Sequence, residues 1–123
     1  DPLLEYVLST SIAERNFSFF REKYCFIGHT HEPIVFKLES GFCTATPLTP
    51  GVGLVLGEAR MLINPGSVGQ PRDGDPRASY GILDTDASQF RLHRVAYDIE
   101  AVQTKIMKAN LPVHLATRLE QGR

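Results

Sequence analysis

The sequence predicts an α/β fold in which a mainly antiparallel sheet is flanked by helices. Short apolar and alternating segments, which are typical of strands, occupy residues 24–97. Segments with helical spacing and helix-capping residues lie before and after them. With 123 residues, of which 42% are hydrophobic, the chain is long enough to bury a core. We therefore expect residues 1–123 to form a single unit.

Two helices are predicted at the start of the chain. Asp1 is a favourable N-cap, Pro2 suits the first helical position, and apolar residues continue at helical spacing. Ser11 and Glu14 have the spacing of a capping box, which predicts a second helix over residues 12–22. Because the chain opens on a helix signal without an initiator methionine, we expect a fragment or a processed product, although removal of the methionine would give the same start.

Strands are expected throughout the middle of the chain. They occupy residues 24–28, 34–39, 42–46, 60–63, 79–84 and 89–97. Gly41 predicts a turn between the second and third of these, and residues 47–53 and 64–76 predict loops because they are rich in proline and glycine. The last two strands are expected to form a hairpin. Asp98 then predicts the N-cap of a helix through about residue 109, and Pro112 the start of a last short one.

Charge and composition exclude several classes of protein. The 13 basic and 14 acidic residues leave no overall field that would attract nucleic acid or anionic lipid, although a local basic site stays open. No apolar run approaches the roughly 18 residues of a membrane span. Cys25 and Cys43 lie in apolar surroundings without a C-x-x-C pattern. This favours free thiols in a reducing, cytoplasmic compartment, and it leaves a disulfide between them open.

A pair of histidines carries the strongest signal for a site. An apolar strand delivers the chain to Gly28, and His29 and His31 follow two positions apart. In near-extended backbone such residues project to the same side, so both imidazoles would reach one metal or two adjacent metals. The alternative is a surface or structural pair, which is the more frequent outcome for an isolated H-x-H motif. No carboxylate stands at a recognisable ligand spacing, so the predicted site is incomplete.

Further motifs surround and follow this pair in order. The sequence reads G-H-T-H-E-P at residues 28–33, I-N-P-G-S-V-G-Q-P-R-D at 63–73, A-S-Y-G-I-L-D at 78–84 and R-V-A-Y-D at 94–98. The first resembles the last metal-binding motif of calcineurin-like metallophosphoesterases, and the others are similar to the segments that follow it in bacterial and archaeal members. The likeness covers essentially the whole chain, and the ordered combination is more specific than any one motif.

The resemblance implies particular roles for residues of this chain. His29 would bind one metal and His31 the other, while Asn64 and Arg72 would contact the substrate, a phosphate ester. The two divalent ions would be manganese, iron, nickel or zinc. For Arg72, the alternative is a solvated charge in a turn-rich connection.

Other motifs of that family are missing from the chain. They read D-x-H, G-D-x-x-D, G-N-H-[DE] and a further histidine, and in the family they supply the bridging aspartate and most other ligands. None of the four occurs here. No catalytic residue is therefore assigned to the chain, and we expect it to be inactive in isolation.

The resemblance also implies that the chain is the C-terminal half of an α/β/β/α sandwich and contributes one sheet to it. An inner face without its partner sheet would expose apolar surface. We therefore expect the chain to bind its own N-terminal half, to form a homo-oligomer or to be poorly stable. Neither membrane nor nucleic acid is indicated as a partner. The alternative to a phosphatase or phosphodiesterase is a non-catalytic scaffold of the same fold, which the intact histidine pair disfavours.

Overall fold

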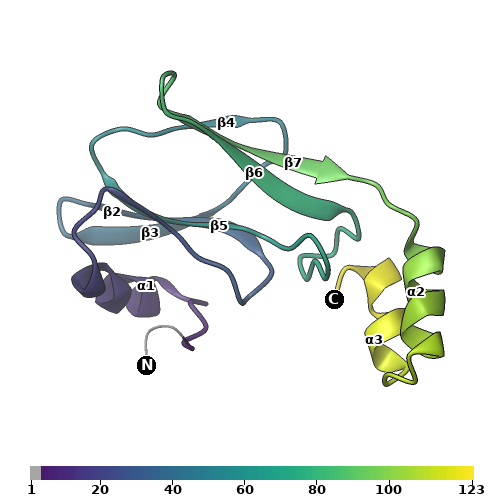
Figure 1. Ribbon diagram of the computed structural model, residues 1–123. Helices are drawn as coiled ribbons and strands as arrows, with labels where there is room; N and C mark the ends of the chain where they lie inside the picture. Colours follow the sequence, from purple (N-terminus) through teal and green to yellow (C-terminus); the bar gives the residue numbers. More distant parts are fainter. Residues whose placement is uncertain (1–3) are drawn as a thin grey trace.

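The computed structural model of the protein describes residues 4–123, which form two β-sheets with helices before and after them (Figure 1). In spatial order, the four-stranded sheet consists of β1 (Tyr24–Phe26), β5 (Arg60–Pro65), β2 (Pro33–Glu39) and β3 (Phe42–Pro47). The three-stranded sheet consists of β4 (Gly53–Val55), β7 (Gln89–Val95) and β6 (Ala78–Asp84). The β1–β5 pair is parallel and every other pair of the described strands is antiparallel. The predicted mainly antiparallel arrangement is confirmed.

The helices lie at the two ends of the chain. The N-terminal one is α1 (Thr10–Asn16), which continues into the 3₁₀ turn η1 (Phe17–Phe19). After β7 come α2 (Ile99–Lys108), α3 (His114–Thr117) and the 3₁₀ turn η2 (Leu119–Gln121). In Figure 1, α1 lies beneath the four-stranded sheet, whereas α2 and α3 pack together beside one end of the sheets.

The four-stranded sheet is the middle layer, because each of its faces packs against a different partner. Successive residues of a strand face opposite sides. Val35 and Ile63 therefore join the core between the two sheets, where Phe90 of β7 meets them. Their neighbours Phe36 and Leu62 join a second core on the other face, which α1 covers. The second core also contains Val7, Ala13 and Phe17.

The structure corrects the expectation of a single sheet with a bare inner face. No strand is predicted between residues 47 and 59, where prolines and glycines indicate a loop over residues 47–53, yet Gly53–Val55 pairs with β7. The strands β4, β7 and β6 thus form a sheet of their own, which covers the face expected to be bare. Within this sheet, the Phe90 ring of β7 lies over Gly81 of β6, where an added Cβ would stand 2.1 Å from Phe90 Cζ.

The N-terminal helices differ from the prediction. Residues 5–8 form no regular element, and the part of the predicted first helix that falls on residues 1–3 lies outside the described residues. Helix α1 begins at Thr10, because the side chain of Ser9 caps it by accepting from Ile12 N at 3.3 Å. Ser11, the expected cap, shares a 3.0 Å hydrogen bond with Ser9 Oγ instead.

Local signals elsewhere agree better with the structure. Asp98 is the N-cap of α2, and its Oδ1 accepts from Ala101 N at 2.9 Å. Gly41 adopts the expected turn between β2 and β3, with φ 81°. The β6–β7 hairpin also forms as predicted. No helix within residues 4–123 is both long and apolar enough to span a bilayer.

The two cysteines are free thiols. Both are partly buried against the core beneath α1, and burial raises the pKa of Cys25 and of Cys43. They are packing residues, because a protonated thiol is a poor nucleophile and a poor metal ligand.

Candidate metal centre

The histidine segment leaves the sheet where β1 and β5 run in parallel. Their pairing continues past the end of β1, because Ile27 N donates to Ile63 O at 2.9 Å. Gly28 and Asn64, the next residues of the two segments, therefore lie side by side. Ligand sites in α/β proteins gather at the carboxyl ends of parallel strands. The fold thus brings residues 28–31 to a position that suits a site.

The backbone of this segment is left-handed at both histidines. His29 has φ 73° and His31 has φ 63°, a region that residues other than glycine seldom adopt. Thr30 N donates to Gly28 O at 2.9 Å, which closes a three-residue turn around His29. The expectation of near-extended backbone is therefore wrong. Conformations of this kind persist where the surroundings hold them, and they cluster at functional sites.

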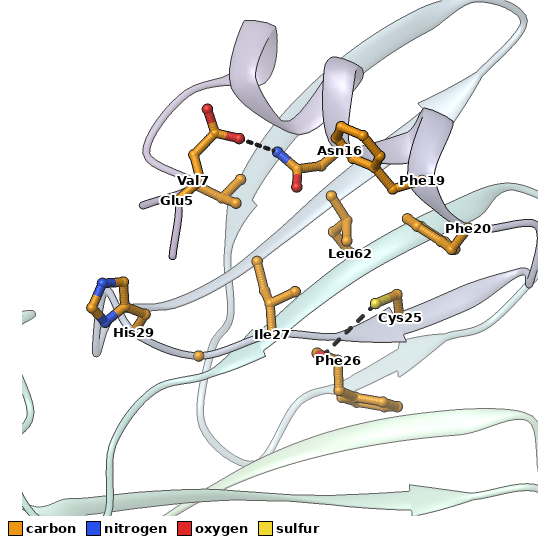
Figure 2. Close-up of a pocket in the computed structure, with 11 residues that line it drawn as sticks. Glu5, Val7, Asn16, Phe19, Phe20, Cys25, Phe26, Ile27, His29 and Leu62 are labelled. Atoms are coloured by element: carbon orange, nitrogen blue, oxygen red, sulfur yellow. Dashed lines mark hydrogen bonds between the residues drawn. The ribbon is translucent and has the colours of Figure 1, made fainter. Parts of the chain in front are cut away.

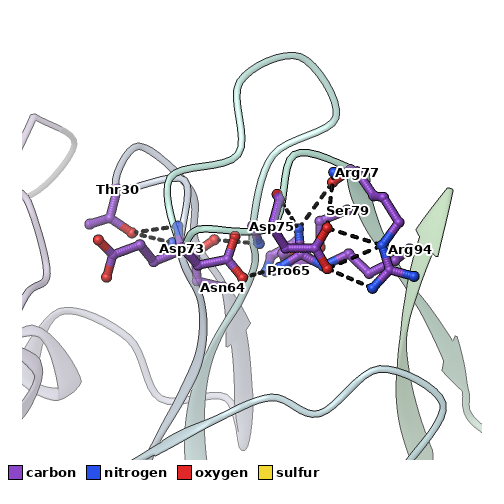
Figure 3. A network of polar contacts seen from close by, with 10 residues as sticks. Thr30, Asn64, Pro65, Asp73, Asp75, Arg77, Ser79 and Arg94 are labelled. Carbon is purple, nitrogen blue, oxygen red and sulfur yellow. Dashed lines mark hydrogen bonds and ion pairs between the residues drawn. The ribbon is translucent and has the colours of Figure 1, made fainter. Parts of the chain in front are cut away.

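The buried amide of Asn64 holds this turn (Figure 3). Its Nδ2 donates to Thr30 Oγ1 at 2.8 Å and to Gly28 O at 3.2 Å. Its Oδ1 accepts from Gly66 N at 2.9 Å, which ties the turn to the loop that follows β5. Asn64 is 0% exposed. A substrate contact by Asn64 stays a prediction, and in this structure its amide faces the two loops.

His31 is fixed by a main-chain acceptor. Its Nδ1 lies 2.7 Å from Gln70 O. Because a carbonyl oxygen can only accept, Nδ1 carries the proton and Nε2 of the neutral ring keeps its lone pair. Such a bond fixes the tautomer and orientation of metal-binding histidines generally. Arg72 N also donates to His31 O, at 3.3 Å.

A buried arginine anchors the loop that carries Gln70 (Figure 3). The side chain of Arg94, on β7, is 3% exposed and forms ion pairs with Asp73 and Asp75. It also donates to Arg77 O at 3.0 Å. Hydrogen bonds from Arg77, assisted by the charge of Arg94, lower the pKa of Asp75 from 3.8 to about 2. These contacts hold the loop that positions His31.

The start of the same loop packs against β6. Ser79 Oγ donates to Pro65 O at 2.6 Å, and Ser79 N donates to Ser67 O at 2.9 Å. Gly66 has φ 84°, and a Cβ there would stand 2.9 Å from Ser79 Oγ and 3.0 Å from Pro33 Cγ. Both the left-handed backbone and the close contacts require glycine at this position.

The imidazole of His29 has different surroundings. His29 is exposed, and its ring stacks on the ring of Tyr6 with the centroids 3.7 Å apart and the planes 27° apart. It stands at one end of a groove of about 430 Å³ along β1 (Figure 2). The lining of the groove is mainly apolar and includes Val7, Phe19, Phe20, Phe26, Ile27 and Leu62.

Comparison with known proteins decides the family. Residues 7–88, more than half of the chain, match the calcineurin-like phosphoesterase superfamily domain. The chain belongs to this superfamily. A metallophosphoesterase from Sphaerobacter thermophilus is similar in structure, with a TM-score of 0.91 and 43% identity over 97% of this chain and 51% of that one. An uncharacterized protein from Methanocaldococcus jannaschii is 43% identical over 98 residues, which are 80% of this chain and 39% of that protein.

A hypothetical protein from Pyrococcus horikoshii OT3 shares the fold. Its TM-score is 0.61 at 16% identity, over 95% of this chain and 39% of that one. The resemblance to calcineurin-like phosphoesterases and the mixed α/β class, with sheets rich in antiparallel pairs and flanked by helices, are therefore confirmed. The chain spans 51% of the Sphaerobacter structure and 39% of the Methanocaldococcus protein.

The two histidines could supply part of a metal centre. His31 presents an unprotonated Nε2, and the ring of His29 is exposed. Within residues 4–123, no group of three or more His, Cys, Asp or Glu side chains is arranged to hold a metal ion. Hydrolytic metal pairs also need carboxylates that bridge and neutralise the ions. The described residues do not supply these carboxylates beside the histidines.

Arg72 lies next to the His31 support. Its Nη2 donates to Gln70 Oε1 at 2.7 Å, and its main-chain nitrogen contacts His31 O. Its Nε is buried and has no hydrogen-bond partner among the described residues. A buried donor without a partner is uncommon in folded proteins. This guanidinium therefore retains an N–H group from which an anion could accept a hydrogen bond.

Sequence reasoning did not find three of the supporting residues. Gln70 acts through its carbonyl, which every residue has, so its side chain gives no signal. Arg94 stands in one of the quoted motifs, but its pairing with Asp73 joins segments that meet only in the folded chain. Tyr6 was assigned to an apolar helix, and nothing in the local pattern placed it against His29.

Proposed function

We propose that residues 1–123 form one C-terminal unit of a metal-dependent phosphoesterase, in which His29 and His31 each bind one of two divalent ions. The observation that carries the proposal is the 2.7 Å contact from His31 Nδ1 to Gln70 O. It leaves the lone pair of Nε2 free to bind a metal ion, in a chain whose family includes metallophosphoesterases.

The residues of the chain have separate tasks in this proposal. Imidazole nitrogens suit manganese, iron, nickel and zinc, and such ions polarise a phosphoryl group and activate water. The Asn64 amide keeps the histidine turn in its left-handed form, so the two donors have fixed positions. The loop held by Arg94 keeps the ring of His31 oriented.

Arg72 is the proposed substrate contact. Its guanidinium stands beside the support of His31 and keeps an unpaired Nε. The planar donors of arginine match the oxygens of phosphate. We therefore assign phosphate esters as the substrate class and the non-bridging oxygens as the group that Arg72 contacts.

The missing carboxylates would come from the N-terminal half of the same protein, docked on the free edge of β1. Strand β1 pairs with β5 on one side and is the edge of its sheet. Parallel sheets are normally continued and covered on both faces, and the apolar groove lies along this edge. The relatives are long enough to supply such a half, because the chain covers 51% of one and 39% of the other. The competing outcome is that the edge of β1 joins two copies of this chain. A cytoplasmic location stays a prediction.

A chimera tests the function directly. Residues 1–123 replace the matching part of the Sphaerobacter metallophosphoesterase, and hydrolysis of bis-p-nitrophenyl phosphate is measured with manganese. We expect turnover that falls at least about 100-fold in His29→Ala and His31→Ala. His114→Ala, which removes an exposed histidine of α3, serves as the matched control and should keep the activity.

Three outcomes separate the hypotheses. A folded chimera with equal turnover in His31→Ala contradicts the metal role. A folded chimera that neither binds manganese nor hydrolyses the ester favours the non-catalytic scaffold. The isolated chain should hydrolyse the ester no faster than buffer containing manganese, and activity of that chain that His31→Ala abolishes would contradict the proposed need for a second half.

A further inference from the structure

We propose that Tyr6 is a positioning residue for His29, a role that rests on the proposed metal site. The two rings are stacked with centroids 3.7 Å apart and an interplanar angle of 27°. A stacked ring covers one face of the imidazole and leaves its edge open. Metal ions bind imidazole nitrogens in the plane of the ring, so stacking and metal binding use different surfaces and can coexist.

The neighbours of Tyr6 fix its position. Glu5 accepts from Arg15 Nη2 at 2.8 Å and from Asn16 Nδ2 at 2.7 Å, which attaches the segment to α1. Val7 is 6% exposed and belongs to the core beneath that helix. Tyr6 is therefore held from both sides by anchors that do not involve His29. The backbone that carries the Tyr6 ring is therefore positioned independently of His29.

His29 depends on the Tyr6 ring more than His31 depends on any one side chain. No ring nitrogen of His29 has a hydrogen-bond partner among the described residues, whereas Nδ1 of His31 is bound to Gln70 O. An exposed imidazole loses rotational freedom when it binds a metal, and ordering it beforehand strengthens binding. Tyr6 supplies that ordering by contact alone, so Tyr6→Phe should replace it and Tyr6→Ala should not.

Nuclear magnetic resonance of the full chain tests the proposal in two steps. The first is the metal-free chemical shift of His29 Cε1–H, which the ring current of Tyr6 displaces. Tyr6→Ala should return it toward the value of an unstructured peptide, and Tyr6→Phe should retain the displacement. The second is a titration with zinc of the chimera described above, in which the second half supplies the missing carboxylates, and it follows the His29 and His31 resonances separately. We expect Tyr6→Ala to weaken the zinc response of His29 about threefold to tenfold, with wild-type affinity in Tyr6→Phe.

The chain contains a matched control in the other sheet. Tyr80 stacks on His93 with centroids 5.2 Å apart and an interplanar angle of 17°. Tyr80→Ala should shift the His93 resonance and leave both the shift and the zinc response of His29 unchanged.

The outcomes distinguish this inference from the function on which it rests. If wild-type His29 and His31 show no response to zinc, the metal site itself is contradicted, and the role of Tyr6 falls with it. If wild type responds and Tyr6→Ala responds equally, the role of Tyr6 alone is overturned. An unchanged His29 shift in Tyr6→Ala also overturns it, because the rings are then not stacked in solution.

Discussion

His31 and His29 are two residues apart in one turn, yet they are held by different kinds of contact. His31 donates to a main-chain carbonyl in a loop that Arg94 locks onto β7. His29 rests on the ring of Tyr6, in a segment attached to α1. One histidine is thus fixed through hydrogen bonds to the three-stranded sheet, and the other through ring contact on the helix side. The position of either histidine can therefore be loosened without loosening the other.

The largest loss of stability is expected when the side chain of Asn64, which supports the turn carrying both histidines, is removed. Asn64→Ala deletes three hydrogen bonds of a fully buried amide and leaves a small cavity. We expect a loss of about 2–4 kcal/mol in the free energy of unfolding, measured by urea denaturation. Gln121→Ala also removes an amide, but from an exposed side chain with no side-chain hydrogen bond among the described residues, so it should change stability by less than about 0.5 kcal/mol. Equal losses in the two variants would contradict the role given to Asn64.

Substitution of Arg94 should alter the surroundings of His31 and leave those of His29 unchanged. Arg94→Met keeps the length of the buried side chain and removes its charge and its bonds to Asp73, Asp75 and Arg77 O. We expect a loss of about 2 kcal/mol and altered resonances for His31 alone. Arg91→Met, at an exposed position of the same strand, is the control and should stay within about 0.5 kcal/mol. A shift of the His29 resonances as large as that of His31 would contradict the separation.

Low pH should weaken the ion pairs that hold the loop beside His31. The pKa of Asp75 is about 2 in the folded chain against an ordinary value of 3.8, because the carboxylate accepts bonds from Arg77 and lies near the charge of Arg94. Its contribution is complete above pH 3.8 and is lost as the pH falls toward 2. Allowing for the partly exposed pair, we expect about 1–2 kcal/mol. Urea unfolding of wild type and Asp75→Asn should differ by this amount at pH 5 and converge near pH 2; a constant difference would contradict the assignment.

The smallest effect concerns a proton and leaves stability unchanged. A long-range ¹H–¹⁵N spectrum at pH 8.5 should show His31 as the Nδ1–H tautomer, because Gln70 O can only accept. Gln70→Ala should preserve this tautomer, since the acceptor is main chain. His29 lacks such an acceptor among the described residues, and it should show the Nε2–H form that exposed histidines prefer. Identical tautomers in the two rings would remove the difference between them.

Much of the fold followed from local patterns, and the exceptions have physical causes. The β6–β7 hairpin and the Asp98 cap depend on residues close in sequence, and both were predicted. The division into two sheets was not, because β4 is short and its pairing with β7 crosses many residues. The predicted helix is not found over residues 5–8, because this irregular segment places Val7 in the core instead.

The candidate site divides in a similar way. The sequence order of motifs identified His29 and His31 and placed a loop beside them, and residues 28–31 do lie against residues 64–72 in the structure. The expected near-extended backbone was wrong, because both histidines have left-handed φ values, and such values at residues other than glycine carry no sequence signal. The supports from Gln70 and Arg94 could not be predicted either, since they arise from contacts between distant segments.

Gly122 links the end of the chain to this loop. Its backbone has φ 63°, its carbonyl accepts from Gly74 N at 3.0 Å, and a methyl group there would stand 2.8 Å from main-chain atoms of Gly74 and Asp75. The end of the chain and the loop that carries Arg72 are therefore packed together too closely for an added methyl group. Melting residues 99–122 would remove the Gly74–Gly122 hydrogen bond and leave the loop with its anchors on Arg94 and Ser79, so the order of the last two helices should add to the order of this loop.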